Sequence, residues 1–156
     1  MPGSGRFRSG IVAPMRLAFD PPTDPAAYPF SHEIRVRFAE TDAMGIVHHA
    51  AYLPYLEETR VAYLDAIGHP YLAVRGEGVD FAVLEAYVRY LAPLRFDDRV
   101  RVHLKVASAT RATFQLGYLL TVAGKPASTG VTVHGCVDPT GRPVRMPVWL
   151  RDLGQG

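Results

Sequence analysis

The sequence predicts an α+β fold in which an antiparallel sheet of about five strands curls around one long central helix. Two observations carry this prediction. The segment that follows residue 50 has apolar residues at helical spacing, whereas most of the remaining chain alternates with a period of two. The alternating runs also follow one another directly with short turns between them, which favours antiparallel pairing.

Length and composition bound the class of protein. With 156 residues, of which 48% are hydrophobic, the chain fits one domain with a sizeable core. We expect residues 31–150 to form this domain and residues 1–30, rich in Gly, Pro, Ser and Ala, to form a flexible tail. A formal charge of +2 gives little support to a nucleic-acid partner. The single Cys136 excludes an intrachain disulfide and suits a reducing compartment, so we expect a cytoplasmic protein.

No run of residues approaches the ~20 apolar positions that a membrane span requires, so we expect no membrane span.

The first strand is indicated by the alternation of Ile34, Val36 and Phe38 with arginines. Four further alternating runs lie at residues 79–91, 100–106, 114–122 and 127–137. We expect one unbroken alternation over residues 81–91, and we expect His103 and His134, at polar strand positions, to lie at the surface or an interface.

The long helix is predicted between about Ala50 and Ile67. Pro54 limits its beginning, because proline is accommodated only in the first helical turn. Gly68 is a suitable residue to end it, and a second short helical segment is expected over residues 70–75. After residue 137 the chain is expected to turn toward an exposed end.

The loop between the first strand and the long helix contains the candidate reactive residues. Asp42 precedes His49 by seven positions, and His49 lies at the expected mouth of the helix. The first N–H groups of a helix lack intrahelical acceptors and can polarise a carbonyl group. A carboxylate beside them could attack that carbonyl or activate water against it. Gly45 gives this loop backbone freedom.

Each of these residues also has a simpler interpretation. An aspartate at a helix entry is often only a turn or cap residue, and His49 could be structural. The adjacent His48 and His49 lack the spacing of a metal motif, so we expect no metal. Glu57 could be only a solvated helix residue or part of an interface salt bridge.

Two blocks of the sequence resemble a known family. The first block is TDAMGIVHHAAY at residues 41–52 with YLEETR at residues 55–60, and the second is FAVLEAYVRYLAPLRFDD at residues 81–98. Together they resemble the hotdog-fold acyl-CoA thioesterases of the 4-hydroxybenzoyl-CoA thioesterase type, particularly the Tol-Pal-associated subgroup. The likeness covers about residues 33–147. The chain departs from that subgroup at Phe38, where tyrosine is frequent, and at Pro54 within the helix.

The resemblance implies hydrolysis of acyl-CoA to a free acid and coenzyme A, with no cofactor, since coenzyme A is part of the substrate. It implies that Asp42 acts as nucleophile or as general base, and that the backbone N–H near His49 polarises the thioester carbonyl. The His49 side chain corresponds to one that orients substrate or assists proton transfer. Glu57 follows eight residues later on a similar helix face and is a candidate to orient His49 or water.

The same resemblance gives candidates for binding the acyl-CoA. They are Gly45, Val47, His48 and Tyr52 around the helix mouth and, for the phosphates of coenzyme A, Arg142 and Arg145. Arginines at exposed turns are, alternatively, only solubilising. A sheet with one helix leaves an apolar face or edge to cover, so we expect a homodimer or a dimer-of-dimers tetramer with active sites where the helix mouth meets the partner.

Two other functions stay open at this point. One is a hotdog dehydratase or hydratase, which would need a histidine paired with an acid but not the Asp42 carboxylate. The other is a non-catalytic acyl-binding scaffold protein. The sequence does not identify the acyl group, and it does not choose between the two routes of hydrolysis.

Overall fold

The computed structural model describes residues 19–156, and in that range it confirms the predicted architecture. One antiparallel sheet has the strand order β1-β3-β4-β5-β2. Its strands are β1 (Phe30–Arg35), β2 (Asp80–Tyr90), β3 (Arg99–Ala109), β4 (Thr113–Val122) and β5 (Lys125–Val137). The helices are α1 (Tyr52–Ala66), α2 (Tyr71–Gly76) and α3 (Val148–Leu153), with short 3-10 turns at Pro25–Ala27, Phe38–Glu40 and His49–Ala51.

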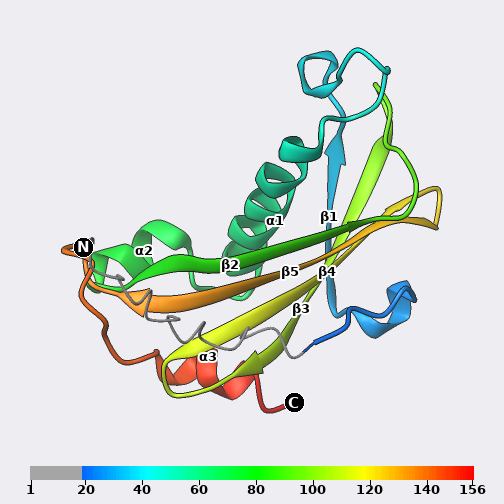
Figure 1. The fold of residues 1–156 in the computed structure, drawn as a ribbon. Helices are drawn as coiled ribbons and strands as arrows, with labels where there is room; N and C mark the ends of the chain where they lie inside the picture. The colour runs from blue at the N-terminus through cyan, green and yellow to red at the C-terminus, as the bar shows by residue number, and fades with distance from the viewer. Residues whose placement is uncertain (1–18) are drawn as a thin grey trace, which may run out of the picture.

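The sheet bends around α1, which packs against β1 and β3 (Figure 1). The core between the helix and the sheet is formed by residues that are almost completely buried on α1 and on the inner face of the central strands. They include Tyr55, Leu56, Val100, Val102, Leu104, Tyr118 and Leu120. Burial of this apolar surface on one face of the sheet is what fixes the helix in place.

The ends of α1 follow the sequence signals. The regular helix begins at Tyr52, after the 3-10 turn, so Pro54 falls in its first turn. Gly68 follows the helix with φ +82°, a left-handed conformation that glycine adopts without strain. The second helical segment is α2, one residue later than predicted.

The single alternation expected over residues 81–91 is wrong, because the pairing of β2 with β5 shifts register between Val83 and Glu85. Phe81 lies opposite the buried Cys136, whereas Tyr87 lies opposite Val131 and lines a hollow on the outer face. A β-bulge inserts one residue and so exchanges the two faces of the strand beyond it. Odd-numbered residues before and after the bulge therefore face opposite sides.

The two strand histidines are buried, which corrects the expected surface positions. His134 is 0% exposed, stacks on Phe114 at 4.8 Å, and has Nε2 2.7 Å from the hydroxyl of Thr132. His103 is 7% exposed and has Nε2 3.1 Å from the hydroxyl of Thr121. Burial lowers the pKa of both imidazoles, in each case with a smaller contribution from a nearby arginine. Neutral histidines with hydroxyl partners are compatible with a covered strand.

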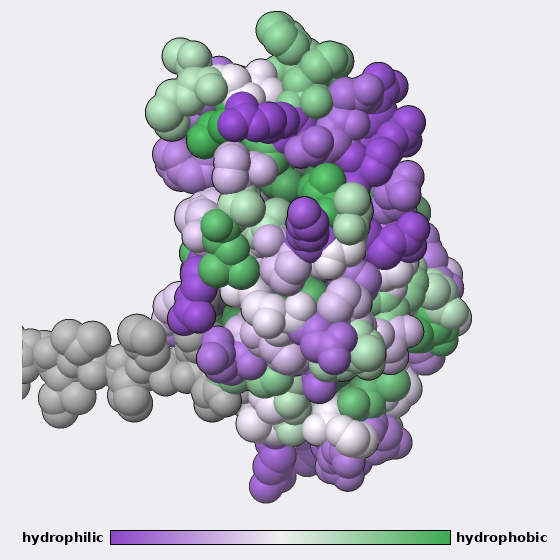
Figure 2. Space-filling view, turned by 90° about the vertical axis from the view of Figure 1, so that its right-hand side faces the viewer, coloured by the Kyte–Doolittle hydropathy of each residue, from purple (hydrophilic) through white to green (hydrophobic). Residues whose placement is uncertain are grey.

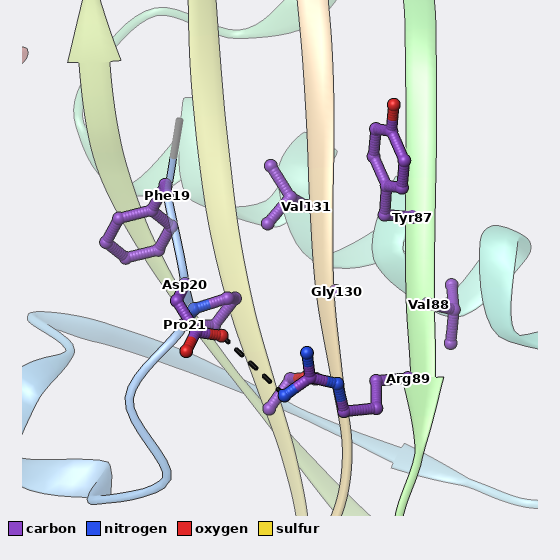
Figure 3. A pocket seen from close by; sticks show the side chains of 9 residues that line it. Phe19, Asp20, Pro21, Tyr87, Val88, Arg89, Gly130 and Val131 are labelled. Carbon is purple, nitrogen blue, oxygen red and sulfur yellow. Dashed lines mark ion pairs between the residues drawn. The ribbon is translucent and has the colours of Figure 1, made fainter. Parts of the chain in front are cut away.

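The prediction of a flexible tail falls partly on residues 1–18, which lie outside the described residues. From Phe19 onward the chain lies against the outer face of the sheet (Figure 3). There Asp20 pairs with Arg89 of β2 at 3.8 Å, and the segment borders a hollow of about 180 Å³. Asp24 then caps the first 3-10 turn by accepting from the Ala26 N–H at 2.9 Å.

The C-terminal segment also differs from the expected exposed end. It contains α3, whose Leu150 is buried, and Trp149 stacks on His69 with ring centroids 3.9 Å apart. A helix of six residues gives little periodic signal in a sequence. Within residues 19–156, none of the helices is both long and apolar enough to cross a membrane.

Candidate active site

Asp42 begins a tight loop that closes on itself. Its N–H donates to the Ile46 carbonyl at 2.8 Å, and its Oδ1 accepts from the Met44 N–H at 2.8 Å. Gly45 makes the turn possible with φ +74°. Oδ2 of Asp42 accepts no hydrogen bond from residues 19–156. One carboxylate oxygen thus holds the loop and the other stays available.

The loop is fastened to the rest of the fold on both sides. The Val47 N–H donates to the Leu94 carbonyl at 2.8 Å, which ties the loop to the segment after β2. The His48 N–H donates to the Glu40 carbonyl, also at 2.8 Å. These bonds fix where Asp42 lies relative to the start of α1.

Glu40 joins the same loop to the helix through its side chain. Its carboxylate accepts from the Tyr55 hydroxyl at 2.6 Å and from the Arg37 N–H at 2.8 Å. Burial by itself would raise the pKa of Glu40, but the hydrogen bonds from Tyr55 and Arg37 outweigh it and lower the pKa. Burial and the bond to Glu40 raise the pKa of Tyr55, so the phenol stays a hydrogen-bond donor. The hydrogen bond between Tyr55 and Glu40 therefore holds the start of the Asp42 loop against α1.

The helix mouth contains an unused amide. His48 caps the 3-10 turn, with Nδ1 accepting from the Ala50 N–H at 3.1 Å. The His48 carbonyl accepts from the Ala51 N–H at 2.9 Å. The His49 N–H donates to no acceptor in the described part of the chain. Such an amide is a donor that a ligand's oxygen can use.

Asp42 and His49 line the same pocket, which has a volume of about 430 Å³. Its other walls are mostly apolar and come from the loop, the start of α1 and the end of β2. They are Met44, Ile46, Val47, Tyr52, Tyr90, Leu91, Ala92 and Pro93. One charged group and one free amide in an apolar hollow match the usual design of a small-molecule site.

Exposed apolar side chains also lie at this end of the molecule, beside charged ones such as Arg37. Phe38 and Phe96 are exposed and meet edge to face at 5.7 Å, and Met44 is 74% exposed. Figure 2 shows hydrophobic surface at the same end, over the loops that flank the site. An apolar acyl chain that enters the pocket past these apolar side chains would therefore remove little polar surface from water.

The structure brings together most of the residues expected at the helix mouth. Asp42, His49, Val47 and Tyr52 line the pocket, and Gly45 shapes the loop between two lining residues. His48 acts on the backbone as a cap, and its ring lies 4.1 Å from the ring of His49.

Three other candidates lie elsewhere in the same chain. Glu57 has a 70% exposed side chain, lies 3.8 Å from Arg60, and borders a separate hollow at the start of β2. Arg145 lines a hollow of about 110 Å³ with Arg111 and Arg151. Arg142 lies in an exposed turn, where its N–H donates to Asp138 at 3.0 Å. Within one protomer none of the three reaches Asp42's pocket.

Sequence reasoning missed Tyr90 and the segment Leu91–Pro93 as pocket residues. Tyr90 lies 41 positions after His49, yet its hydroxyl donates to the His49 carbonyl at 3.1 Å. The only sequence signal was that residues 81–98 form the second block of the family likeness. For metals, residues 19–156 contain no cluster of three or more His, Cys, Asp or Glu side chains placed to hold an ion.

The fold and the pocket define a class of protein, the hotdog-fold proteins. Residues 36–153 match the Thioesterase-like superfamily. The chain belongs to this superfamily.

Known relatives agree with this assignment. The chain is 39% identical over 119 residues to a protein of Aquifex aeolicus whose name gives it an unproven esterase activity; the match covers 76% of this chain and 92% of that one. It is 30% identical over 124 residues to the 1,4-dihydroxy-2-naphthoyl-CoA hydrolase of Synechococcus elongatus, covering 74% and 90%. A solved DHNA-CoA thioesterase from Staphylococcus aureus superposes with a TM-score of 0.71 at 29% identity, covering 74% and 78%. Relatives with these names support thioester hydrolysis as the reaction class.

Proposed function

We propose that this protein is an acyl-CoA thioesterase that hydrolyses its substrate to a free acid and coenzyme A. One observation carries the proposal: an available carboxylate oxygen of Asp42 and the unbonded amide of His49 belong to one apolar pocket. The relatives named as acyl-CoA hydrolases support it. Coenzyme A enters as part of the substrate, and no further cofactor is proposed.

The chemistry needs only these two groups. The thioester carbonyl oxygen accepts a hydrogen bond from the His49 amide, which stabilises the negative charge that develops on it. In one route the Asp42 carboxylate attacks the carbonyl carbon, the C–S bond breaks, coenzyme A leaves as a thiolate, and water cleaves the resulting anhydride. In the other route Asp42 takes a proton from water as the water attacks. In both routes the His49 side chain would orient the substrate or assist proton transfer.

We place the complete site at the contact of two protomers. The free edge of the sheet at β2 is 11 residues long and carries the exposed apolar side chains of Val83, Leu84 and Tyr90. Such an edge is suited to pairing with a second copy. The opposite edge, β1, is shorter and bears charged residues, including Glu33 and Arg35. A dimer, or a tetramer built from two such dimers, would use the β2 edge.

An antiparallel β2 pair would bring the missing candidates to the pocket. Tyr90, at one end of β2, lines the pocket, whereas Asp80, at the other end, pairs with Val137 just before the segment that carries Arg145. Two-fold pairing sets the Asp80 end of one strand beside the Tyr90 end of its partner. Arg145 of one protomer would then bind the phosphates of coenzyme A held by the other. Arg142 is a second candidate on the same segment, and Glu57 would approach from the partner's α1.

Arg145 has suitable surroundings for that role. It shares its hollow with Arg111 and Arg151, and none of the three forms an ion pair within the described residues. Three guanidinium groups without a carboxylate attract a polyanion such as a phosphate group. The cytoplasmic location and the Tol-Pal-associated subgroup remain predictions.

The test is thiol release from short, medium, long and aromatic acyl-CoAs by the wild type, Asp42→Asn and Asp42→Ala. Asparagine keeps an oxygen that can accept from the Met44 N–H, so the loop is preserved while the charge is lost. We expect both variants to lose roughly 10² to 10⁴ in kcat, the usual contribution of a catalytic base.

Other outcomes point to the alternatives. Near-normal turnover of a β-hydroxyacyl thioester by Asp42→Asn would favour a dehydratase or hydratase. Tight acyl-CoA or product binding without turnover on any substrate would favour the scaffold protein.

A further inference from the structure

Tyr90 is the last residue of β2, and its backbone is held from both sides. The carbonyl of the preceding Arg89 accepts from the Ser128 hydroxyl at 2.8 Å. The N–H of the following Leu91 donates to the Ala127 carbonyl at 2.9 Å. The Tyr90 side chain is therefore presented from a fixed point on the sheet toward the helix mouth.

The side chain makes two directed contacts there. Its ring meets Tyr52 edge to face, with centroids 4.8 Å apart and planes at 87°. Tyr52 is the first residue of α1 and is 3% exposed, so it forms a rigid wall. The Tyr90 hydroxyl donates to the His49 carbonyl at 3.1 Å, although Tyr90 itself is about half exposed. The hydroxyl thus reaches across the pocket to the peptide that follows the free amide.

Both polar groups of that peptide, which joins His49 to Ala50, are hydrogen-bonded. Its carbonyl, from His49, accepts from Tyr90, and its N–H, from Ala50, donates to Nδ1 of His48 at 3.1 Å. The preceding peptide has its His48 carbonyl bonded to the Ala51 N–H. With its own peptide and the next one fixed, the His49 N–H is a backbone donor of this turn that has no acceptor among residues 19–156 and can serve a ligand. Hydrogen bonding at the carbonyl end of its peptide also strengthens it as a donor.

We propose that Tyr90 is a positioning residue, which fixes the direction of the His49 amide so that this amide can stabilise the oxyanion of the reaction. The proposal rests on the proposed thioester hydrolysis. Tyr90 does not exchange a proton with the substrate; it acts through the backbone of His49. Its contribution belongs to the transition state, in which the carbonyl oxygen carries most charge.

The test is Tyr90→Phe, which removes the hydroxyl and keeps the ring against Tyr52. We expect kcat to fall about ten-fold, the worth of one neutral hydrogen bond, while KM changes less than about two-fold. The pH profile should keep its shape, because Tyr90 exchanges no proton with the substrate. In amide NMR spectra the His49 and Ala50 signals should shift.

Tyr87→Phe is the matched control. Tyr87 lies on the same strand but on the outer face, and its hydroxyl donates to Glu85 at 3.1 Å. It should leave kcat and the His49 and Ala50 signals unchanged. Loss of kcat in both variants to the same extent would show a general effect on β2 and overturn the proposal.

The remaining outcomes separate the two proposals. If Tyr90→Phe turns over the substrate as fast as the wild type and its amide signals are unchanged, the positioning role is overturned and the thioesterase function stands. Absence of wild-type turnover on every thioester overturns the function. The amide shifts then still decide whether Tyr90 holds the His49 peptide.

Discussion

At the scale of single residues, the backbone and the side chain of His49 can be tested separately. His49→Ala removes the imidazole and keeps the amide, whereas His49→Pro removes the N–H. Proline is compatible here because the His49 N–H has no acceptor among residues 19–156, and His48 has φ −60° and ψ 138°, a conformation favoured before proline. If the amide polarises the carbonyl, His49→Pro should lose about 10² to 10³ in kcat.

We expect His49→Ala to retain much more activity than His49→Pro, with similar unfolding temperatures for both. Steady-state kinetics and thermal unfolding are the measurements. Equal activity of the two variants would assign the function of His49 to its side chain and remove the amide from the mechanism.

His134 makes the fold sensitive to acid. Burial, and secondarily the charge of Arg60, lower the pKa of this imidazole to about 3, and its Nδ1 has no hydrogen-bond partner among residues 19–156. In the unfolded chain the pKa is about 6.5, so between these values the unfolded state binds more protons. The stability it confers is thus present above about pH 6.5 and is lost as the pH falls toward 3.

Between pH 6.5 and 4.5 this linkage should cost about 2 kcal/mol of unfolding free energy. Urea unfolding of the wild type and of His134→Leu over that range measures it. The variant should show a correspondingly weaker pH dependence, whatever its stability at neutral pH. Parallel curves for the two proteins would mean that His134 is not the responsible group.

At the scale of elements, the N-terminal segment and β4 are matched in shape. A Cβ at Gly117 would overlap Cε1 of Phe19 and lie 3.0 Å from its Cδ1, so the Phe19 ring needs glycine beneath it. Lys105 covers the same ring at 5.7 Å from its centroid. Gly117→Ala should therefore displace Phe19 and destabilise the fold by roughly 1 to 2 kcal/mol.

A double-mutant cycle with Phe19→Ala tests this contact. In the Phe19→Ala background the same Gly117→Ala change should be neutral or stabilising, because alanine loses less backbone entropy than glycine in a strand. Chemical unfolding gives the four free energies. Additive effects would show that the segment and Gly117 are independent.

Elements with their own periodic signal were predictable, and those fixed by tertiary contacts were not. The five strands and α1 follow from spacing and turn residues, which are local properties. The bulge between Val83 and Glu85 depends on how β2 pairs with β5, and α3 depends on contacts such as Trp149 with His69. The burial of His134 depends on Thr132 and Phe114 together, which alternation along one strand does not reveal.

The site divides in the same way. Asp42 and His49 lie seven residues apart, so a local loop and helix mouth were enough to associate them. Tyr90 joins them only because β2 ends beside the start of α1. Glu57 and Arg145 have no place near Asp42 within one chain, and a role for either requires a second copy.

At the scale of the whole molecule, the proposed pairing through the β2 edge would decide both assembly and activity. Val83 is 52% exposed on this edge, so lysine there is tolerated in a single protomer but would place a charge inside a β2 pair. Sedimentation should give the wild type at least the mass of two 17.1 kDa chains and Val83→Lys the mass of one. Because the arginines and Glu57 would come from the partner, thioesterase activity should fall with the mass. Ala27→Lys places the same charge on the exposed 3-10 turn that lies near β1, at the opposite edge of the sheet, and should keep both mass and activity. A monomeric wild type, or a Val83→Lys protein that stays dimeric and active, would rule out pairing through β2 and with it the shared site.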